Sequence, residues 1–224
     1  SIVAWGNKVI AAWNDGEGFV TTGAGQGYAT STDGGINWVD RGNFPVAANP
    51  NFEWTSDPVL AVNEKTGAFY FTALFDADLS ATSGVGIIKG RMNNDGSMTW
   101  NTPVSIATVA TNADFIDKQW VVADSSSGKV YLSYTRFPAA GSVINFRAST
   151  DSNATTWGSA VPISGGADNG LVQGSRPIVA GDGTVYVQYY KIGPVDADFV
   201  LVKKSTTAGA SFGSASTAVS YFTN

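Results

Sequence analysis

The sequence predicts an all-β fold, a β-propeller of four-stranded antiparallel blades, of which four are visible in the 224 residues. Three observations predict it. The composition is poor in Lys, Glu and Leu and rich in Gly, Ser, Thr, Val and aromatic residues, as in β proteins. Two unlike short motifs each recur four times in the same order. Strand-length apolar runs ending in Gly-containing turns precede the second motif.

The first repeated motif is a polar turn that ends in an aromatic residue. Its copies are "STDGGINW" (31–38), "NNDGSMTW" (93–100), "STDSNATTW" (149–157) and "STTAGASF" (205–212). If Asp33, Asp95, Asp151 and Thr207 are equivalent, the steps between copies are 62, 56 and 56 residues. This spacing suits a repeat of one supersecondary unit, which must stack on its neighbours to bury its faces.

The second motif is an apolar strand, and it keeps the same phase as the first. Its copies are "KVIAAW", "AFYFTAL", "KVYLSYT" and "TVYVQYY", and alignment of Ile10, Tyr70, Tyr131 and Tyr186 gives steps of 60, 61 and 55 residues. One unit therefore reads as four strands, for example "PVLAV", "AFYFTAL", "GIIKGRMN" and "PVSIA". We expect one propeller region over 1–224, with blades at about 1–45, 46–108, 109–165 and 166–224.

Composition excludes several classes of chemistry. The chain has no cysteine and no histidine, which removes disulfides, thiolate sites and imidazole triads. Acid–base chemistry would use carboxylates, Tyr or Lys. The net charge of −5 without Lys/Arg clusters disfavours a nucleic-acid partner, and no apolar run is long enough for a membrane helix. No cofactor is expected. The acidic loops could hold Ca²⁺ through oxygen ligands, but their spacing fits no EF-hand loop, which favours solvated acidic side chains.

The turn motif resembles the Asp-box, or BNR repeat, of sialidase-like β-propellers. The match is complete in the first copy, weaker in the second, one residue longer in the third and degenerate in the fourth, where Thr207 replaces the acid. The residues that carry it are Ser31, Asp33, Gly35, Trp38, Asn93, Asp95, Trp100, Ser149, Asp151, Trp157, Ser205, Gly209 and Phe212.

The physical interpretation of this turn is a fastener rather than a catalytic site. A short Asp side chain can accept hydrogen bonds from the N–H groups that follow it, Gly can take positive φ, and we expect the Trp ring to be buried under the hairpin. Arg91, Arg147 and Lys203 recur two residues before the motif, and their recurrence favours a structural or edge-guarding role on outer strands.

Candidate ligand-binding residues come from the opposite ends of the strands. Alignment of the innermost strands places Asp57, Lys118 and Arg176 at one equivalent position near the propeller axis. These charges form either a floor for a ligand or a ring of mutually paired groups. Residues just before these strands and aromatic residues at the ends of the second strands complete the candidate set: Glu53, Trp54, Asp117, Trp13, Tyr134, Tyr189 and Tyr190.

The resemblance to sialidases implies a secreted retaining glycosidase with three arginines, a Tyr nucleophile paired with a Glu, and an Asp acid/base. This chain lacks an Arg-Ile-Pro segment, has only three Glu, and shows four blades where sialidases have six. No catalytic residue can therefore be assigned, and we expect this chain by itself to be inactive.

Two hypotheses follow. One is a sialidase-like glycan-recognising propeller, part of an extracellular glycoside hydrolase or a lectin-like relative, whose partner is a carbohydrate or glycoconjugate. The other is a non-catalytic structural or protein-interaction propeller. In either case we expect missing blades or a second chain to cover apolar sheet faces, unless four blades close the ring.

Overall fold

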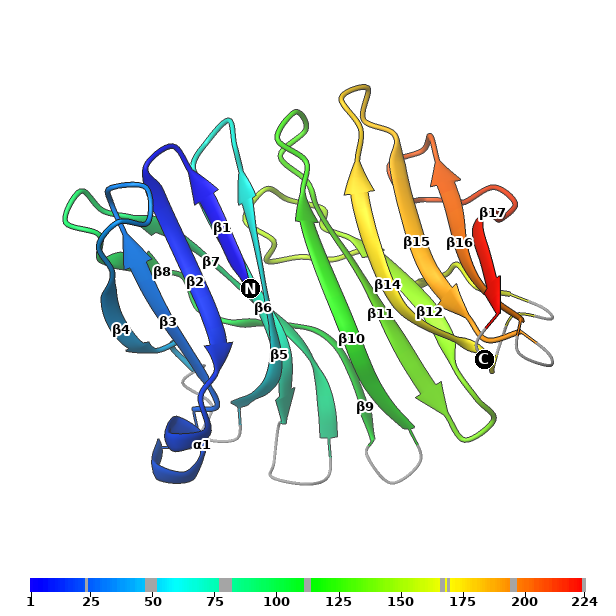
Figure 1. Cartoon of the computed structure of the whole chain (residues 1–224), viewed down its shortest axis with the longest axis horizontal. Helices are drawn as coiled ribbons and strands as arrows, with labels where there is room; N and C mark the ends of the chain where they lie inside the picture. The colour runs from blue at the N-terminus through cyan, green and yellow to red at the C-terminus, as the bar shows by residue number, and fades with distance from the viewer. Residues whose placement is uncertain are drawn as a thin grey trace. The chain divides into compact units, whose positions relative to one another are not determined.

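The computed structural model describes residues 1–22, 24–46, 52–76, 82–110, 114–165, 168, 170–193 and 197–222. It contains four antiparallel sheets of the propeller-blade type, as predicted, and Figure 1 labels their strands. The chain divides into two compact units, Ser1–Asn112 and Ala113–Asn224, each of which holds two blades. The described residues include no helix long and apolar enough to cross a membrane.

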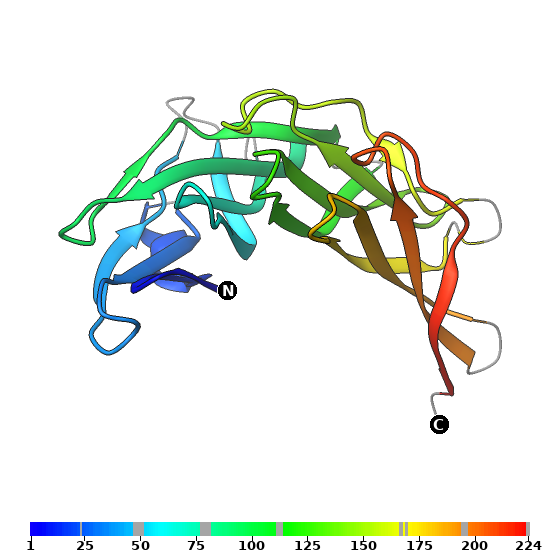
Figure 2. The same cartoon turned by 90° about the horizontal axis from the view of Figure 1, so that it is seen from above.

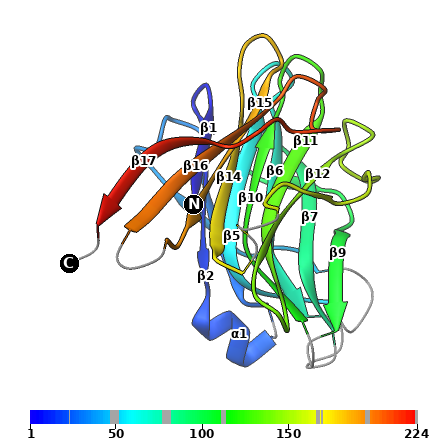
Figure 3. The ribbon, with the colours of Figure 1, turned by 90° about the vertical axis from the view of Figure 1, so that its right-hand side faces the viewer.

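Blade 1 has the order β1-β2-β3-β4. Its strands are β1 (Ile2–Trp5), β2 (Lys8–Asn14), β3 (Gln26–Ser31) and β4 (Val39–Asn43). A short helix, α1 (Gly16–Thr22), follows β2 and is visible beyond the end of that strand in Figure 3. Asp15 caps it, because its carboxylate accepts a hydrogen bond from the Gly18 N–H at 3.0 Å. The sequence interpretation had expected only a loop between these two strands.

Blade 2 is made of β5 (Glu53–Asn63), β6 (Ala68–Asp76), β7 (Thr82–Met92), β8 (Met98–Trp100) and β9 (Val104–Ala110). The expected fourth strand is split, since β8 and β9 both pair with β7, one after the other along its length. Figure 3 shows β9 beside β7. The expected loop residues 77–81 lie outside the described part of the chain.

Blades 3 and 4 repeat this meander in the second unit. Blade 3 has β10 (Asp114–Ala123), β11 (Val130–Pro138), β12 (Val143–Ala148) and the short β13 (Val161–Pro162). Blade 4 has β14 (Val172–Val179), β15 (Val185–Lys191), β16 (Ala197–Ser205) and β17 (Ser216–Phe222), and Figure 2 shows its course from β14 in yellow to β17 in red.

Each unit has its own core between its two blades. In the first unit, aromatic rings dominate: Phe44 of blade 1 stacks on Phe71 of blade 2 with ring centres 3.6 Å apart, and Tyr28 stacks on Phe44 at 4.4 Å. In the second unit, Tyr131 and Phe146 of blade 3 pack in one cluster with Val185 and Val187 of blade 4. Alternate residues of β6 and β15 supply many of these contacts, which is the period of two expected for strands.

Candidate functional site

The innermost strands of three blades carry a bulge with one residue in the left-handed backbone region. These residues are Asp57 (φ 60°), Lys118 (φ 53°) and Gly174 (φ 67°). Each lies four residues before the strand residue that pairs with Tyr70, Tyr131 or Tyr186. The expected equivalence of Asp57, Lys118 and Arg176 is therefore wrong for Arg176, which lies two residues beyond the equivalent position. Two non-glycine residues held at positive φ mark these bulges as special positions.

A polar cluster occupies the end of blade 3 where β10 begins and β11 ends. The Arg136 Nε donates to Asp114 Oδ2 at 2.6 Å, and the guanidinium makes a second close contact with the same oxygen through Nη2. The carboxylate is largely enclosed, with 10% of its side chain exposed, whereas the Arg136 side chain is 49% exposed. The hydrogen bond to Asp114 raises the pKa of Arg136. The ion pair thus has its guanidinium at the surface and its carboxylate inside the blade.

Tyr134 and Arg147 extend this cluster inward. Tyr134 pairs with Asn145, and Arg147 lies diagonally across on β12, opposite Leu132, so that both side chains lie on one sheet face. Burial raises the pKa of the Tyr134 hydroxyl, although the Arg147 guanidinium beside it acts in the opposite direction. Arg147 Nε and Asp114 Oδ1 are buried without a hydrogen-bond partner among the residues that the structure describes. A structural or edge-guarding role was expected for Arg147, and its buried Nε does not suit the edge-guarding alternative.

Blade 4 has charged groups at the corresponding end. Lys191 Nζ donates to Asp168 Oδ1 at 2.5 Å, and the Tyr190 hydroxyl donates to Asp198. Tyr189 is 1% exposed, and its buried hydroxyl has no partner within the described ranges. Burial, with the nearby charge of Asp168, raises the pKa of Tyr189 to about 12. Tyr189 is thus a core residue, and Tyr190 is engaged with its own blade.

Arg176 stacks on an aromatic ring that the sequence analysis did not select. Its guanidinium carbon lies 4.2 Å from the centre of the Trp120 ring, and both residues line a cavity of about 280 Å³. The exposed Ile178 and the side chains of Tyr186 and Gln188 belong to the same wall. Of the three charges expected near the axis, Arg176 is the one that lines a described cavity. Lys118 instead lies 4.0 Å from its neighbour Asp117.

The remaining candidates belong to the first unit. Trp54, expected to face a ligand, is 0% exposed and packs edge-on to Phe52 and Phe71, with its indole N–H donating to the Pro45 carbonyl. Its ring therefore offers no surface. Trp13 is partly exposed at the end of β2, where it covers Gly27 closely. Glu53 opens β5 opposite Asp76.

The turn of blade 1 is held by the side chain of Asp33. Its Oδ1 accepts the N–H groups of Ile36 (3.1 Å) and Asn37 (3.0 Å), and Oδ2 accepts the Asn37 amide at 2.7 Å. These hydrogen bonds, led by those from Asn37, lower the pKa of Asp33 to about 2. Trp38 donates its indole N–H to the Gly35 carbonyl, but 41% of the residue is exposed. The expectation of a buried ring is wrong for Trp38.

Blades 3 and 4 close their turns in related ways. Asp151 accepts the N–H groups of Asn153 (2.6 Å) and Thr156 (2.8 Å), and Trp157 donates to the Ala154 carbonyl as Trp38 does to Gly35. Burial acts to raise the pKa of Asp151, but hydrogen bonds from Thr156 and Thr155 outweigh it and hold this pKa well below its usual range. In blade 4, Thr207 Oγ1 accepts one N–H, from Ser211 at 3.1 Å.

Blade 2 departs from this pattern. In the other blades, the turn residue comes three positions after the residue that pairs with Ile10, Tyr131 or Tyr186 of the second motif. In blade 2, Asp95 comes six positions after Lys89, which pairs with Tyr70. The longer β7 carries the turn to blade 1, where Thr30 donates to the Gly96 carbonyl at 2.8 Å. Trp100 donates to the Tyr28 hydroxyl at 3.2 Å. Asp95 accepts only from Ser97 among the described residues.

The structure brings four residues of the second unit into polar contacts that the sequence did not indicate. They are Asp114, Trp120, Arg136 and Arg147, and the sequence selected none of them as a ligand candidate. The alternation of β11 and β12 could have placed Arg136 and Arg147 on the Tyr134 face. Nothing in the sequence indicates that Trp120 meets Arg176. No cluster of three or more acidic, His or Cys side chains suited to a metal occurs among the described residues.

Comparison with known proteins supports the fold. No protein-family model and no curated protein sequence matches the chain. Among solved structures, an α-L-arabinofuranosidase from Fusarium graminearum with an iminosugar inhibitor matches 97% of this chain with 11% identity and a TM-score of 0.71. A Trypanosoma rangeli sialidase matches 97% with 13% identity and a TM-score of 0.64, and a Bacillus licheniformis endo-arabinanase matches 94% with 19% identity and a TM-score of 0.57.

The lengths of these proteins differ from that of the chain. The match spans 65% of the arabinofuranosidase structure, 37% of the sialidase and 72% of the endo-arabinanase. At these identities, the likeness shows the propeller fold and leaves activity to be argued from the residues.

Proposed function

We propose that the chain is part of a carbohydrate-active β-propeller of the sialidase-like kind, that its polar turns are Asp-box turns, and that the full protein acts outside the cell. The blade 3 cluster of Asp114, Arg136 and Arg147, with the buried Tyr134 behind it, is its contribution to the carbohydrate site. The partly exposed Arg176 and Lys118 stay as further ligand-binding candidates, as do Asp57, Glu53 and Trp13.

One observation carries this proposal: a buried carboxylate oxygen and a buried guanidinium N–H in one blade lack partners among the described residues. Unsatisfied buried polar atoms are rare in folded proteins, and each costs about 1–3 kcal/mol. A saccharide hydroxyl that reaches the cluster can donate to Asp114 Oδ1 or accept from Arg147, because a hydroxyl group does both. Arg136 supplies a planar fork of donors at the exposed end of the cluster.

The glycoside-hydrolase names of the structural neighbours support the same class of ligand. This support is an analogy, because it rests on the shared fold alone. The cluster offers no complete acid, nucleophile and arginine set, so we propose recognition of a saccharide by this chain rather than its hydrolysis.

Titration calorimetry tests the proposal, with 3′-sialyllactose and arabinotriose as the probes. We expect measurable binding of at least one probe. Arg136→Lys keeps the charge but removes the fork, and we expect it to weaken binding about tenfold or more. Arg91→Lys is the matched control, because Arg91 is an exposed arginine of the first unit that contacts the Thr66 carbonyl.

Two results would contradict the proposal. One is the absence of binding by a folded chain to either probe. The other is equal weakening by Arg136→Lys and Arg91→Lys, which would remove the blade 3 cluster from the site.

A second candidate function is protein interaction, and the apolar residues of blade 4 beside the Arg176 cavity favour it. Ile178 is 61% exposed and lies with Tyr186 and Val202 around the Arg176 cavity. Apolar side chains grouped on a sheet face suit contact with another blade or chain. Ile178→Asp would abolish an association in light scattering under this alternative and would leave saccharide binding unchanged under the first.

A further inference from the structure

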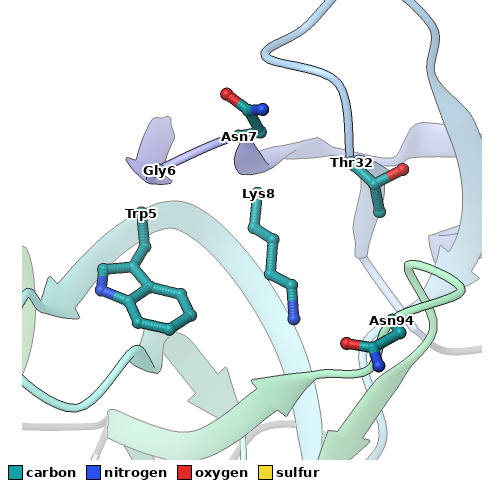
Figure 4. A pocket seen from close by; sticks show the side chains of 6 residues that line it. All are labelled: Trp5, Gly6, Asn7, Lys8, Thr32 and Asn94. Atoms are coloured by element: carbon teal, nitrogen blue, oxygen red, sulfur yellow. The ribbon is translucent and has the colours of Figure 1, made fainter.

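A second cavity lies in the first unit, among the turns at the end of the blades remote from α1. It measures about 410 Å³ and is lined by Trp5, Gly6, Asn7, Lys8, Thr32 and Asn94. Five of these residues come from blade 1, and Asn94 comes from the displaced turn of blade 2. In Figure 4, Trp5 and Lys8 extend side by side from the β1–β2 hairpin, Asn94 enters from the neighbouring blade, and Asn7 stands at the rim. The volume falls within the range of about 300–1,000 Å³ typical of small-molecule sites.

The Trp5 ring is fixed as an aromatic platform. Its indole N–H donates to the Glu64 carbonyl at 2.8 Å. The backbone at Gly67 lies against the ring, since a Cβ built there would come within 2.7 Å of Cε3 and Cζ3. The indole N–H is occupied, 37% of the residue is exposed, and Lys8 Nζ lies over the ring, 5.9 Å from its centre. The exposed part of Trp5 is therefore an apolar surface whose position does not depend on a ligand.

The displaced turn is also fixed against blade 1. Lys8 Nζ donates to the Met92 carbonyl at 2.8 Å, and Arg41 Nη2 donates to the Asp95 carbonyl at 3.1 Å. These contacts, with the bond from Thr30 to Gly96, hold both ends of the turn that carries Asn94. The three-residue extension of β7 therefore builds one wall of the cavity.

Apart from Lys8, the polar side chains of the cavity are neutral and can form hydrogen bonds with a ligand. The side chains of Asn7, Thr32 and Asn94 have no hydrogen-bond partner within the described parts of the chain, and amides and hydroxyls both donate and accept. Lys8 is the one charged residue in the described lining, and it donates one of its three ammonium N–H groups to the Met92 carbonyl. No carboxylate belongs to this lining.

We propose that this cavity binds a neutral pyranose of a saccharide, with one sugar face on Trp5 and its hydroxyls on Asn94 and Thr32. A pyranose combines an apolar face with a rim of hydroxyls that donate and accept, which is the combination that these side chains offer. This site belongs to the first unit and goes beyond the proposed function, which rests on blade 3 of the second unit.

The test is a ¹⁵N-tryptophan NMR titration of the full chain with cellotriose, xylotriose and maltotriose. The chain has seven tryptophans, and Trp5→Phe identifies the Trp5 indole signal. We expect this signal to shift with at least one of the three sugars. Asn94→Ala removes a side chain without a described partner, so the fold should persist, and we expect it to weaken binding at least about threefold. Trp157→Ala, in a turn of blade 3 that contributes no residue to the cavity, is the matched control and should bind normally.

Three outcomes would overturn the inference: no shift of the Trp5 signal with any neutral sugar, equal affinity of wild type and Asn94→Ala, or a stronger Trp5 response to 3′-sialyllactose than to the neutral sugars. Arg136→Lys should leave the Trp5 titration unchanged. Failure of the blade 3 proposal would therefore be visible separately, because that variant reports only on the second unit.

Discussion

Gly67 shows how one residue without a side chain positions another. It holds φ at +66°, and its backbone lies against the Trp5 ring, so that no other residue fits without displacing the tryptophan. The same turn position is taken by Gly183 in blade 4, where φ is +80° but nothing lies within 4 Å of a built Cβ. A comparison of substitutions at the two glycines therefore distinguishes the cost of the positive φ from the cost of a clash with the Trp5 ring.

Substitution of these glycines is the first prediction. We expect Gly183→Ala to cost about 1–2 kcal/mol, the usual cost of the left-handed conformation for alanine. Gly67→Ala should cost about 1–3 kcal/mol more, because the methyl group overpacks the site. Urea unfolding of both variants measures the difference. Equal losses would mean that the contact with Trp5 carries no weight.

Tyr189 carries the second prediction. Its buried hydroxyl lacks a described partner, so Tyr189→Phe should leave the free energy of unfolding unchanged or raise it by up to about 1 kcal/mol. Tyr190→Phe is the matched variant, because it removes the bond to Asp198 and should destabilise by about 1–3 kcal/mol. Thermal unfolding distinguishes them. A clear loss of stability in Tyr189→Phe would show that its hydroxyl is satisfied in solution.

The turns are the elements whose stability should depend on pH. The pKa of Asp33 is about 2 in the folded chain and 3.8 ordinarily, so its contribution is complete above about pH 4 and is lost as the pH falls through about 2. Asp33→Asn should therefore lower the melting temperature at pH 7 and have no effect below pH 2. A difference that persists at low pH would contradict the role of the charge.

Blade 4 allows the reverse experiment, because Thr207 stands where Asp33 and Asp151 stand in their blades. Its hydroxyl accepts one N–H, from Ser211, whereas a carboxylate could also accept others. We expect Thr207→Asp to raise the melting temperature at pH 7 and to lose this gain near pH 2. Thr206→Asp is the control, one residue outside the turn position.

The strands and turns also show how much of the structure could be predicted from the sequence. The two phased motifs predicted four sheets of four strands, because burial in a meander enforces a period of two. The alignment of Arg176 with Asp57 relied on the apolar residues that follow both, and the observed register differs by two residues. The long first step of 62 residues was the one trace of the displaced turn in blade 2. Side-chain partners such as Trp120 and Arg176 depend on packing between blades, which local sequence does not encode.

For the molecule as a whole, the chain spans only part of the proteins that it resembles, and we expect it to bind without turnover. A fluorogenic aryl sialoside and an aryl arabinofuranoside should show no hydrolysis above the uncatalysed rate. Turnover of about 1 s⁻¹ or faster by the purified chain would contradict this expectation. Such a result would require a complete catalytic set in the residues at hand.

The central claim is that a saccharide binds the polar cluster of blade 3. A crystal structure of the chain grown with saturating 3′-sialyllactose or arabinotriose tests it most directly. The account predicts a sugar hydroxyl within hydrogen-bond distance of Asp114 Oδ1 and of Arg147 Nε. Protein groups or water alone on both atoms, with the sugar absent or bound only elsewhere, would contradict it.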